Sequence, residues 1–141
     1  MDPADLAELQ RLLLGAVLRG DTLPGSGEPL RFPDLGFVLA QPEILVVNEN
    51  LAGVPELDDP PKPIRVVDRS ALEAERRGDD LVYLRFGPAE ERDDGVRITL
   101  EARIRSGSQA RAAMGLGGVL ARFERVGSSW QLAEPPQFVA M

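Results

Sequence analysis

A strict alternation of apolar and polar side chains over residues 96–105 constrains the fold more than any other feature of the chain. Valine, isoleucine, leucine and alanine fill the even positions, whereas arginine, threonine and glutamate fill the odd ones. A period of two is typical of a β-strand with one face in a core and the other in water. Residues 81–86 follow the same period, and Asp94-Gly95 is a hairpin signal between the two segments. The alternation therefore predicts an antiparallel sheet.

Residues 3–19 have the apolar spacing of an amphipathic helix. Asp2 can cap the first turn, Pro3 suits the first helical position, and Gly20 suits a C-terminal cap. The apolar face is wider than a single stripe, because three leucines lie outside it: Leu12, Leu14 and Leu18. We expect this helix to lie against the sheet and to meet a second apolar surface as well.

The rest of the chain predicts shorter elements joined by loops. Residues 21–35 and 50–63 are rich in glycine or proline and predict loops. The other expected elements are strands at 37–40, 43–48, 64–67, 118–126 and 130–134, a short closing segment at 138–139, a helix from a capping box at Ser70 to Gly78, and a helical turn at 110–114 within a 106–117 connection. The order predicts a single α+β domain over residues 1–141, with the N-terminal helix packed on a curved, meandering antiparallel sheet.

The composition excludes several kinds of chemistry. The 141 residues include no cysteine and no histidine, which removes disulfides, thiol nucleophiles, imidazole bases and zinc-finger ligands. The net charge is −7, and residues 1–62 carry all of it, with four basic and eleven acidic side chains. Such a balance argues against nucleic acid as a partner, since phosphate binding needs a basic patch. The adjacent acidic pairs lie at turns without the spacing of metal ligands, so neither a metal nor a cofactor is expected.

No apolar run reaches the roughly 18–20 residues of a membrane span, and the first residues are acidic where a secretory signal would be basic. We therefore expect a cytoplasmic protein of bacterial type with no membrane partner.

Four segments together resemble the nuclear transport factor 2-like (cystatin-like) superfamily of small bacterial proteins. They are the helix at 3–19, the strands at 44–48 and 81–86, and a closing hairpin, 117–126 with 129–132, that contains a tryptophan. The resemblance implies a curved sheet wrapped around helices into a cone with an apolar mouth, often in a dimer. Enzymes of that superfamily, such as ketosteroid isomerases and epoxide hydrolases, place Asp, Tyr or Arg inside the cone.

The sequence offers only weak candidates for ligand-binding residues: Tyr83, Arg85 and Trp130. Tyr83 is the single tyrosine and alternates away from the apolar face of its strand, beside Arg85; the alternative role for it is cross-strand packing. Trp130 alternates with Leu132, so it can equally anchor the last hairpin in the core. No catalytic residue is predicted, because the inward positions of the strands are all apolar.

The polar face of the 96–105 strand carries Arg97, Glu101 and Arg103, and the next strand carries Arg122 and Glu124. We expect these side chains to form cross-strand ion pairs on a solvated sheet face.

Two functions remain open from the sequence. The favoured one is a non-catalytic binding or interaction module that takes a small apolar ligand or a second copy of itself. The alternative is a small-molecule lyase, isomerase or hydrolase with a pocket inside the sheet. A homodimer would cover the extra leucines of the helix, Leu120 and the apolar tail 138–141. The competing explanation is that residues 21–42 fold back over the helix.

Overall fold

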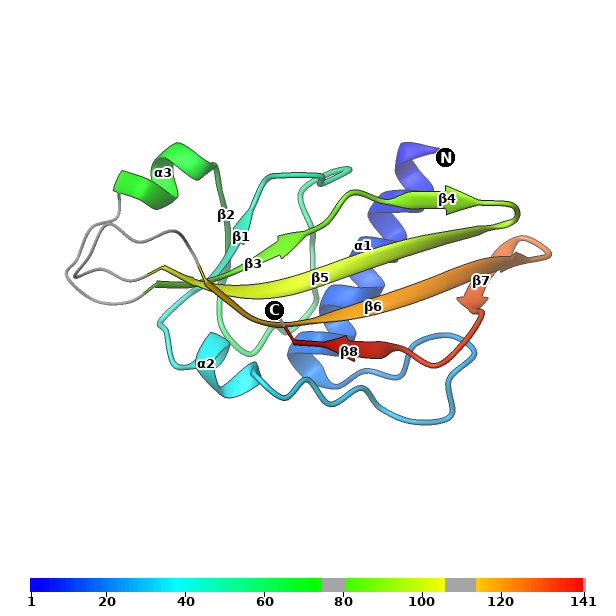
Figure 1. Cartoon of the computed structure of the whole chain (residues 1–141), viewed down its shortest axis with the longest axis horizontal. Helices are drawn as coiled ribbons and strands as arrows, with labels where there is room; N and C mark the ends of the chain where they lie inside the picture. The colour runs from blue at the N-terminus through cyan, green and yellow to red at the C-terminus, as the bar shows by residue number, and fades with distance from the viewer. Residues whose placement is uncertain (75–80, 106–113, 141) are drawn as a thin grey trace.

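The computed structural model describes residues 1–74, 81–105 and 114–140 of the chain (Figure 1). Three helices and eight strands lie within them: α1 (Pro3–Arg19), α2 (Leu35–Leu39), β1 (Ile44–Val47), β2 (Ile64–Val67), α3 (Arg69–Ala74), β3 (Leu81–Phe86), β4 (Glu90–Arg92), β5 (Gly95–Arg105), β6 (Met114–Val126), β7 (Ser129–Leu132) and β8 (Gln137–Val139). The predicted α+β class is confirmed, with α1 packed on one face of the sheet.

The sheet is mixed rather than antiparallel throughout. Its strands follow the order β2-β1-β3-β5-β6-β7, while β4 pairs with β5 and β8 pairs with β6. β1 lies between β2 and β3 and is parallel to both, whereas the pairs from β3 onward are antiparallel. A parallel pair needs a crossover connection, which residues 48–63 provide between β1 and β2. The expected meander therefore describes only the second half of the chain.

The main core lies between α1 and one face of the sheet. Asp2 caps α1 by accepting a hydrogen bond from the Ala4 N–H at 2.9 Å, and Gly20 ends the helix with a φ of 73°, as predicted. The apolar spacing of the helix and the strands predicts eleven core residues. Nine of them are buried, and the other two, Ile104 and Trp130, are partly exposed at the edge of the core. The buried ones are Leu9, Leu13, Val17, Val82, Leu84, Phe86, Ile98, Leu100 and Phe123.

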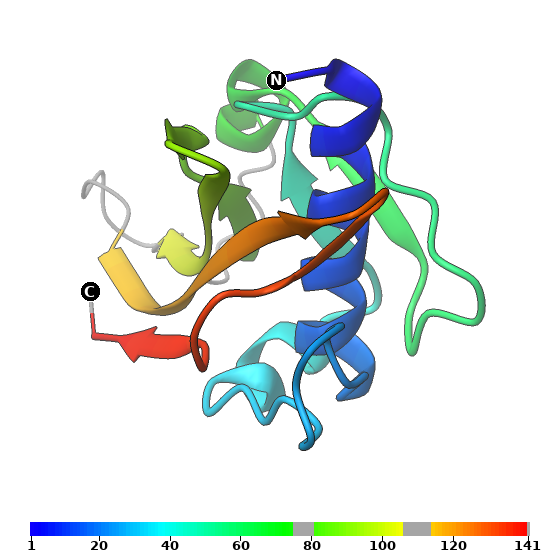
Figure 2. The ribbon, with the colours of Figure 1, turned by 90° about the vertical axis from the view of Figure 1, so that its right-hand side faces the viewer.

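The flank of α1 away from the sheet is covered by two loops of the same chain (Figure 2). The Gln10 side chain, only 2% exposed, donates to the Asn50 carbonyl at 2.7 Å and accepts from the Ala52 N–H at 3.0 Å. Leu30 and Phe32 belong to the core around the C-terminal end of the helix. Leu14 and Leu18 are consequently buried within one copy of the chain and Leu12 is partly buried, so the helix no longer argues for a dimer.

Two local predictions were wrong. The expected strand at 37–40 lies mostly in helix α2, because Leu35, Val38 and Leu39 are spaced to face the core. Ser70 does not cap α3: the Asp68 carboxylate accepts from the Ala71 N–H at 2.6 Å, so the helix begins before the predicted cap. Of the helical turn expected at 110–114, only Met114 is described, and it begins β6, where it pairs with Ile104 of β5. Residues 75–80 and 106–113, including the expected helix end at Gly78, lie outside the described residues.

Candidate functional site

Tyr83 lies in a second, smaller core on the face of the sheet opposite α1. It is 5% exposed and packs with Leu45, Val47 and Val67 of the parallel strands and with Leu72 of α3. Its position between strands agrees with the packing role that the sequence allowed. Its ring packs among these apolar side chains.

Arg85 lies two positions after Tyr83 on β3, on the same outer face of the sheet. It belongs to a row of side chains with alternating positive and negative charge. Its guanidinium contacts Glu49 at 2.9 Å and Glu101 at 3.2 Å, while Arg103 donates to the same Glu101 oxygen at 2.7 Å. Arg69 of α3 extends the chain through Glu49 at 2.6 Å. The five alternating charges tie α3 and the end of β1 to β3 and β5.

The ion pairs on this face are not the ones expected between β5 and β6: Glu101 contacts Arg85 of β3 and Arg103 of its own strand. The face is also not fully solvated. Glu101 is 7% exposed, because Arg85 and Arg103 flank it and Gly118 lies opposite it on β6. Arg97 pairs instead with Glu90 of β4 and lies directly opposite Arg122. The sequence did not predict the burial of Glu101, because that burial depends on residues that are close to Glu101 in space and distant from it in the chain.

The charge chain shifts two pKa values. The hydrogen bond from Arg69 is the largest influence on Glu49 and holds the pKa of that carboxyl below its ordinary value, against the opposing effect of burial. The hydrogen bond to Glu101 raises the pKa of Arg103. Both shifts favour the charged forms, so this cluster holds fixed ion pairs rather than a group ready to exchange protons.

Trp130 lies at the other end of the sheet, in the hairpin of β6 and β7. The Arg125 guanidinium stacks over its ring, 4.8 Å from the ring centre, and is held at 2.8 Å by Asp5 of α1. A cavity of about 490 Å³ next to them is lined mainly by acidic side chains of α1 and of the β4–β5 turn. Within residues 1–74, 81–105 and 114–140, no three acidic side chains are grouped to hold a metal ion.

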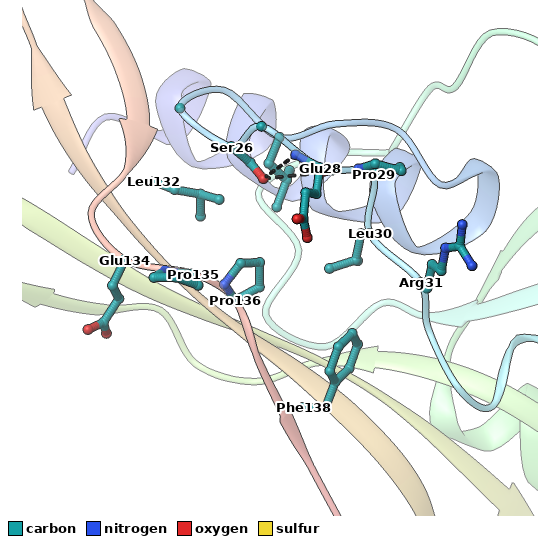
Figure 3. A pocket seen from close by; sticks show the side chains of 13 residues that line it. Ser26, Glu28, Pro29, Leu30, Arg31, Leu132, Glu134, Pro135, Pro136 and Phe138 are labelled. Carbon is teal, nitrogen blue, oxygen red and sulfur yellow. Dashed lines mark hydrogen bonds between the residues drawn. The ribbon is translucent and has the colours of Figure 1, made fainter.

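A larger cavity involves none of these three candidates. It is a groove of about 830 Å³ between residues 23–31 and residues 132–138 (Figure 3). In Figure 1 the first segment passes along the side of β8 that faces away from β6. The groove is therefore open along one edge of the sheet.

Contacts with β7 hold the first wall of this groove in place. The Leu132 N–H donates to the Pro24 carbonyl at 2.8 Å, which closes the free edge of β7. Gly25 follows with a φ of 86°, and a Cβ there would lie 3.2 Å from both the Gln131 Cβ and the Leu132 nitrogen. Glycine adopts a positive φ without strain and has no Cβ to meet β7, so the loop can approach β7 this closely. Beyond this point it separates from the C-terminal segment, and the groove begins.

Figure 3 shows Leu30, Pro136 and Phe138 directed into a common space from the two walls. Phe138 is 49% exposed although it is one of the largest apolar side chains in the chain. The carboxylate of Glu28 extends over the groove, and its backbone is fixed because Ser26 Oγ accepts from the Glu28 N–H at 3.2 Å and donates to its carbonyl at 3.1 Å. Such a site can bury apolar groups and attract a positive charge.

The sequence did not identify this groove as a site. It predicted residues 21–35 only as a loop and noted residues 138–141 as an apolar tail. The two segments are more than 100 positions apart, and the pairing of β8 with β6 and the hydrogen bond from Leu132 to Pro24 bring them together. A phenylalanine two positions after Pro135-Pro136 was the one signal available in the sequence.

Comparisons of the chain with protein-family models, with curated proteins and with solved structures gave no match. The resemblance to the nuclear transport factor 2-like superfamily therefore stays a prediction. Among the described residues, no helix is both long enough and apolar enough to cross a membrane.

Proposed function

We propose that this protein is a non-catalytic binding module and that the groove between residues 23–31 and 132–138 is its binding site. The observation that carries the proposal is the exposed Phe138, which faces Leu30 across a cavity of about 830 Å³. Ligand sites are generally concave and apolar with a few polar groups that set orientation, and Glu28 is such a group here. The net charge of −7 supports a partner other than nucleic acid.

The distribution of charged groups supports binding rather than catalysis. Glu101, the buried carboxylate of the described residues, lies on the outer face of the sheet and is neutralised by Arg85 and Arg103. Glu28, by contrast, is exposed at the rim of the groove. The groove therefore offers a surface for apolar contact with a carboxylate at its rim.

Titration with Nile red, a neutral dye whose fluorescence rises in apolar surroundings, tests the site. Phe138→Ser should weaken dye binding several-fold, because it removes the largest apolar side chain of the groove. Phe37→Ser is the matched control, since Phe37 is 55% exposed and lies in α2 outside the groove lining. Equal effects of the two variants, or no dye binding by the parent chain, would contradict the proposal.

A further inference from the structure

The free edge of β8 forms part of the C-terminal wall of the groove. Residues 137–139 pair with β6 on one side, and among the described residues no backbone group is bonded to them on the other side. The preceding Pro135 and Pro136 have no backbone N–H, so no amide of these two residues can donate to an added strand. The neighbouring β7 differs, because Pro24 already occupies its edge.

We infer that the groove binds an extended peptide segment, which adds as a further strand to the free edge of β8. This inference rests on the proposed function and specifies its partner. An unpaired strand edge presents N–H and C=O groups that another backbone can satisfy, and alternate side chains of the added strand then point to opposite sides. Those on the inner side would meet Leu30, Pro136 and Phe138.

The charge at the rim selects a basic peptide. Glu28 extends over the groove, Glu134 lines the end next to Pro135, and Arg31 points away from the centre of the groove in Figure 3. A lysine or arginine on the added strand would pair with Glu28. A second copy of this chain fits less well, since it would bring another Glu28 and Glu134 to the same edge.

A fluorescently labelled, capped peptide of about seven residues with alternating valine and lysine is the probe, because strands of this length are typical of sheet edges. Fluorescence polarisation measures its affinity for the full chain. Hydrogen exchange of the 137–139 amides, followed by NMR, measures protection of the β8 edge. We expect saturable binding and slower exchange of at least one of these amides when the peptide is bound.

Two altered peptides separate backbone pairing from charge. N-methylation of alternate amides keeps every side chain and removes the hydrogen bonds of one edge, so it should weaken binding about tenfold. Glutamate in place of lysine should abolish measurable binding. Unchanged affinity after N-methylation would overturn strand addition, and equal binding of the glutamate peptide would overturn the selection for a basic partner.

Two protein variants place the peptide in the groove. Glu28→Gln should weaken binding of the lysine peptide about two- to fivefold, the usual effect of one exposed charge pair, whereas Glu56→Gln changes the net charge equally outside the groove lining and should leave binding unchanged. Equal losses in both variants would show attraction to the net charge alone and overturn the inference.

Different results would refute the peptide inference and the proposed binding site. Nile red binding that depends on Phe138, without binding of the lysine peptide, would refute the peptide and leave the binding site in place. Sedimentation equilibrium gives the remaining outcome. A dimer that Phe138→Ser dissociates, while Phe37→Ser does not, would identify a second copy as the occupant and overturn the peptide.

Discussion

Neutralising Glu101 tests whether the charges on the outer face of the sheet act as part of the core or as ordinary surface ion pairs. Glu101→Gln keeps the size of the side chain and one acceptor oxygen but removes the negative charge. Arg103 and Arg85 then lose the carboxylate that they contact at 2.7 and 3.2 Å. Arg85 keeps its contact with Glu49, whereas the cluster as a whole becomes more positive.

The magnitude follows from the exposure of the three side chains. Removal of one partner from a fully buried pair costs about 3–5 kcal/mol, because a charge is left without compensation. The Glu101 side chain is 9% exposed, but those of Arg85 and Arg103 are 28% and 23% exposed and can turn toward water. We therefore expect Glu101→Gln to lower the free energy of unfolding by about 2 kcal/mol.

Urea denaturation measures this loss as a decrease of roughly 1 M in the midpoint, for a typical dependence on denaturant. Glu124→Gln is the matched control, because Glu124 is exposed at a position of β6 opposite Gly95, on the same face of the sheet. It should change the stability by less than about 0.5 kcal/mol. If Glu101→Gln costs no more than Glu124→Gln, the carboxylate contributes no more than a surface charge and the argument from burial is wrong.

Three further predictions concern the core, the loss of stability at acid pH and the single tryptophan. Leu100→Ala should cost about 2–5 kcal/mol in urea denaturation, since Leu100 is 1% exposed, and a loss below about 0.5 kcal/mol would contradict its place in the core. The pKa of Glu49 is lower in the folded than in the unfolded chain, so the stability that its carboxylate contributes is complete above the ordinary pKa of 4.5 and is lost as pH falls through the folded pKa. Glu49→Gln should therefore be less stable than the parent chain at pH 7. The urea midpoints of the two proteins should converge in acid, and a gap that stays constant with pH would contradict this argument. Arg125→Gln uncovers one face of Trp130, the only tryptophan, so its emission should move to longer wavelength, and unchanged emission would refute the stacking.

Local patterns predicted the longest elements correctly. The caps Asp2 and Gly20 and the apolar spacing between them gave α1, because a helix of this length satisfies its own backbone and needs only one face covered. The strict alternation gave β5 and the inward set Val96, Ile98 and Leu100. Failures fell on short elements such as α2, where a few residues carry no clear period and long-range contacts decide.

The groove could not be predicted by the same means. Glu28 and Leu30 lie in a segment without regular structure, and Phe138 lies in a three-residue strand. Nothing local relates them, since their proximity depends on the antiparallel pairing of β8 with β6 and on the bond from Leu132 to Pro24. The weak candidates Tyr83, Arg85 and Trp130 were chosen by residue type, and the fold placed them in a second core, an ion-pair chain and a hairpin.

The sequence by itself determined the α+β class, the helix and the inward face of each long strand, because side-chain periodicity and caps act within a few residues. Only the tertiary structure decided that β1 pairs in parallel with both β2 and β3, that Glu101 is buried between two arginines, and that β8 lies beside an apolar groove. The physical reason is that strand pairing joins residues far apart in the chain. The exposure of each side chain then depends on neighbours that the local pattern does not specify.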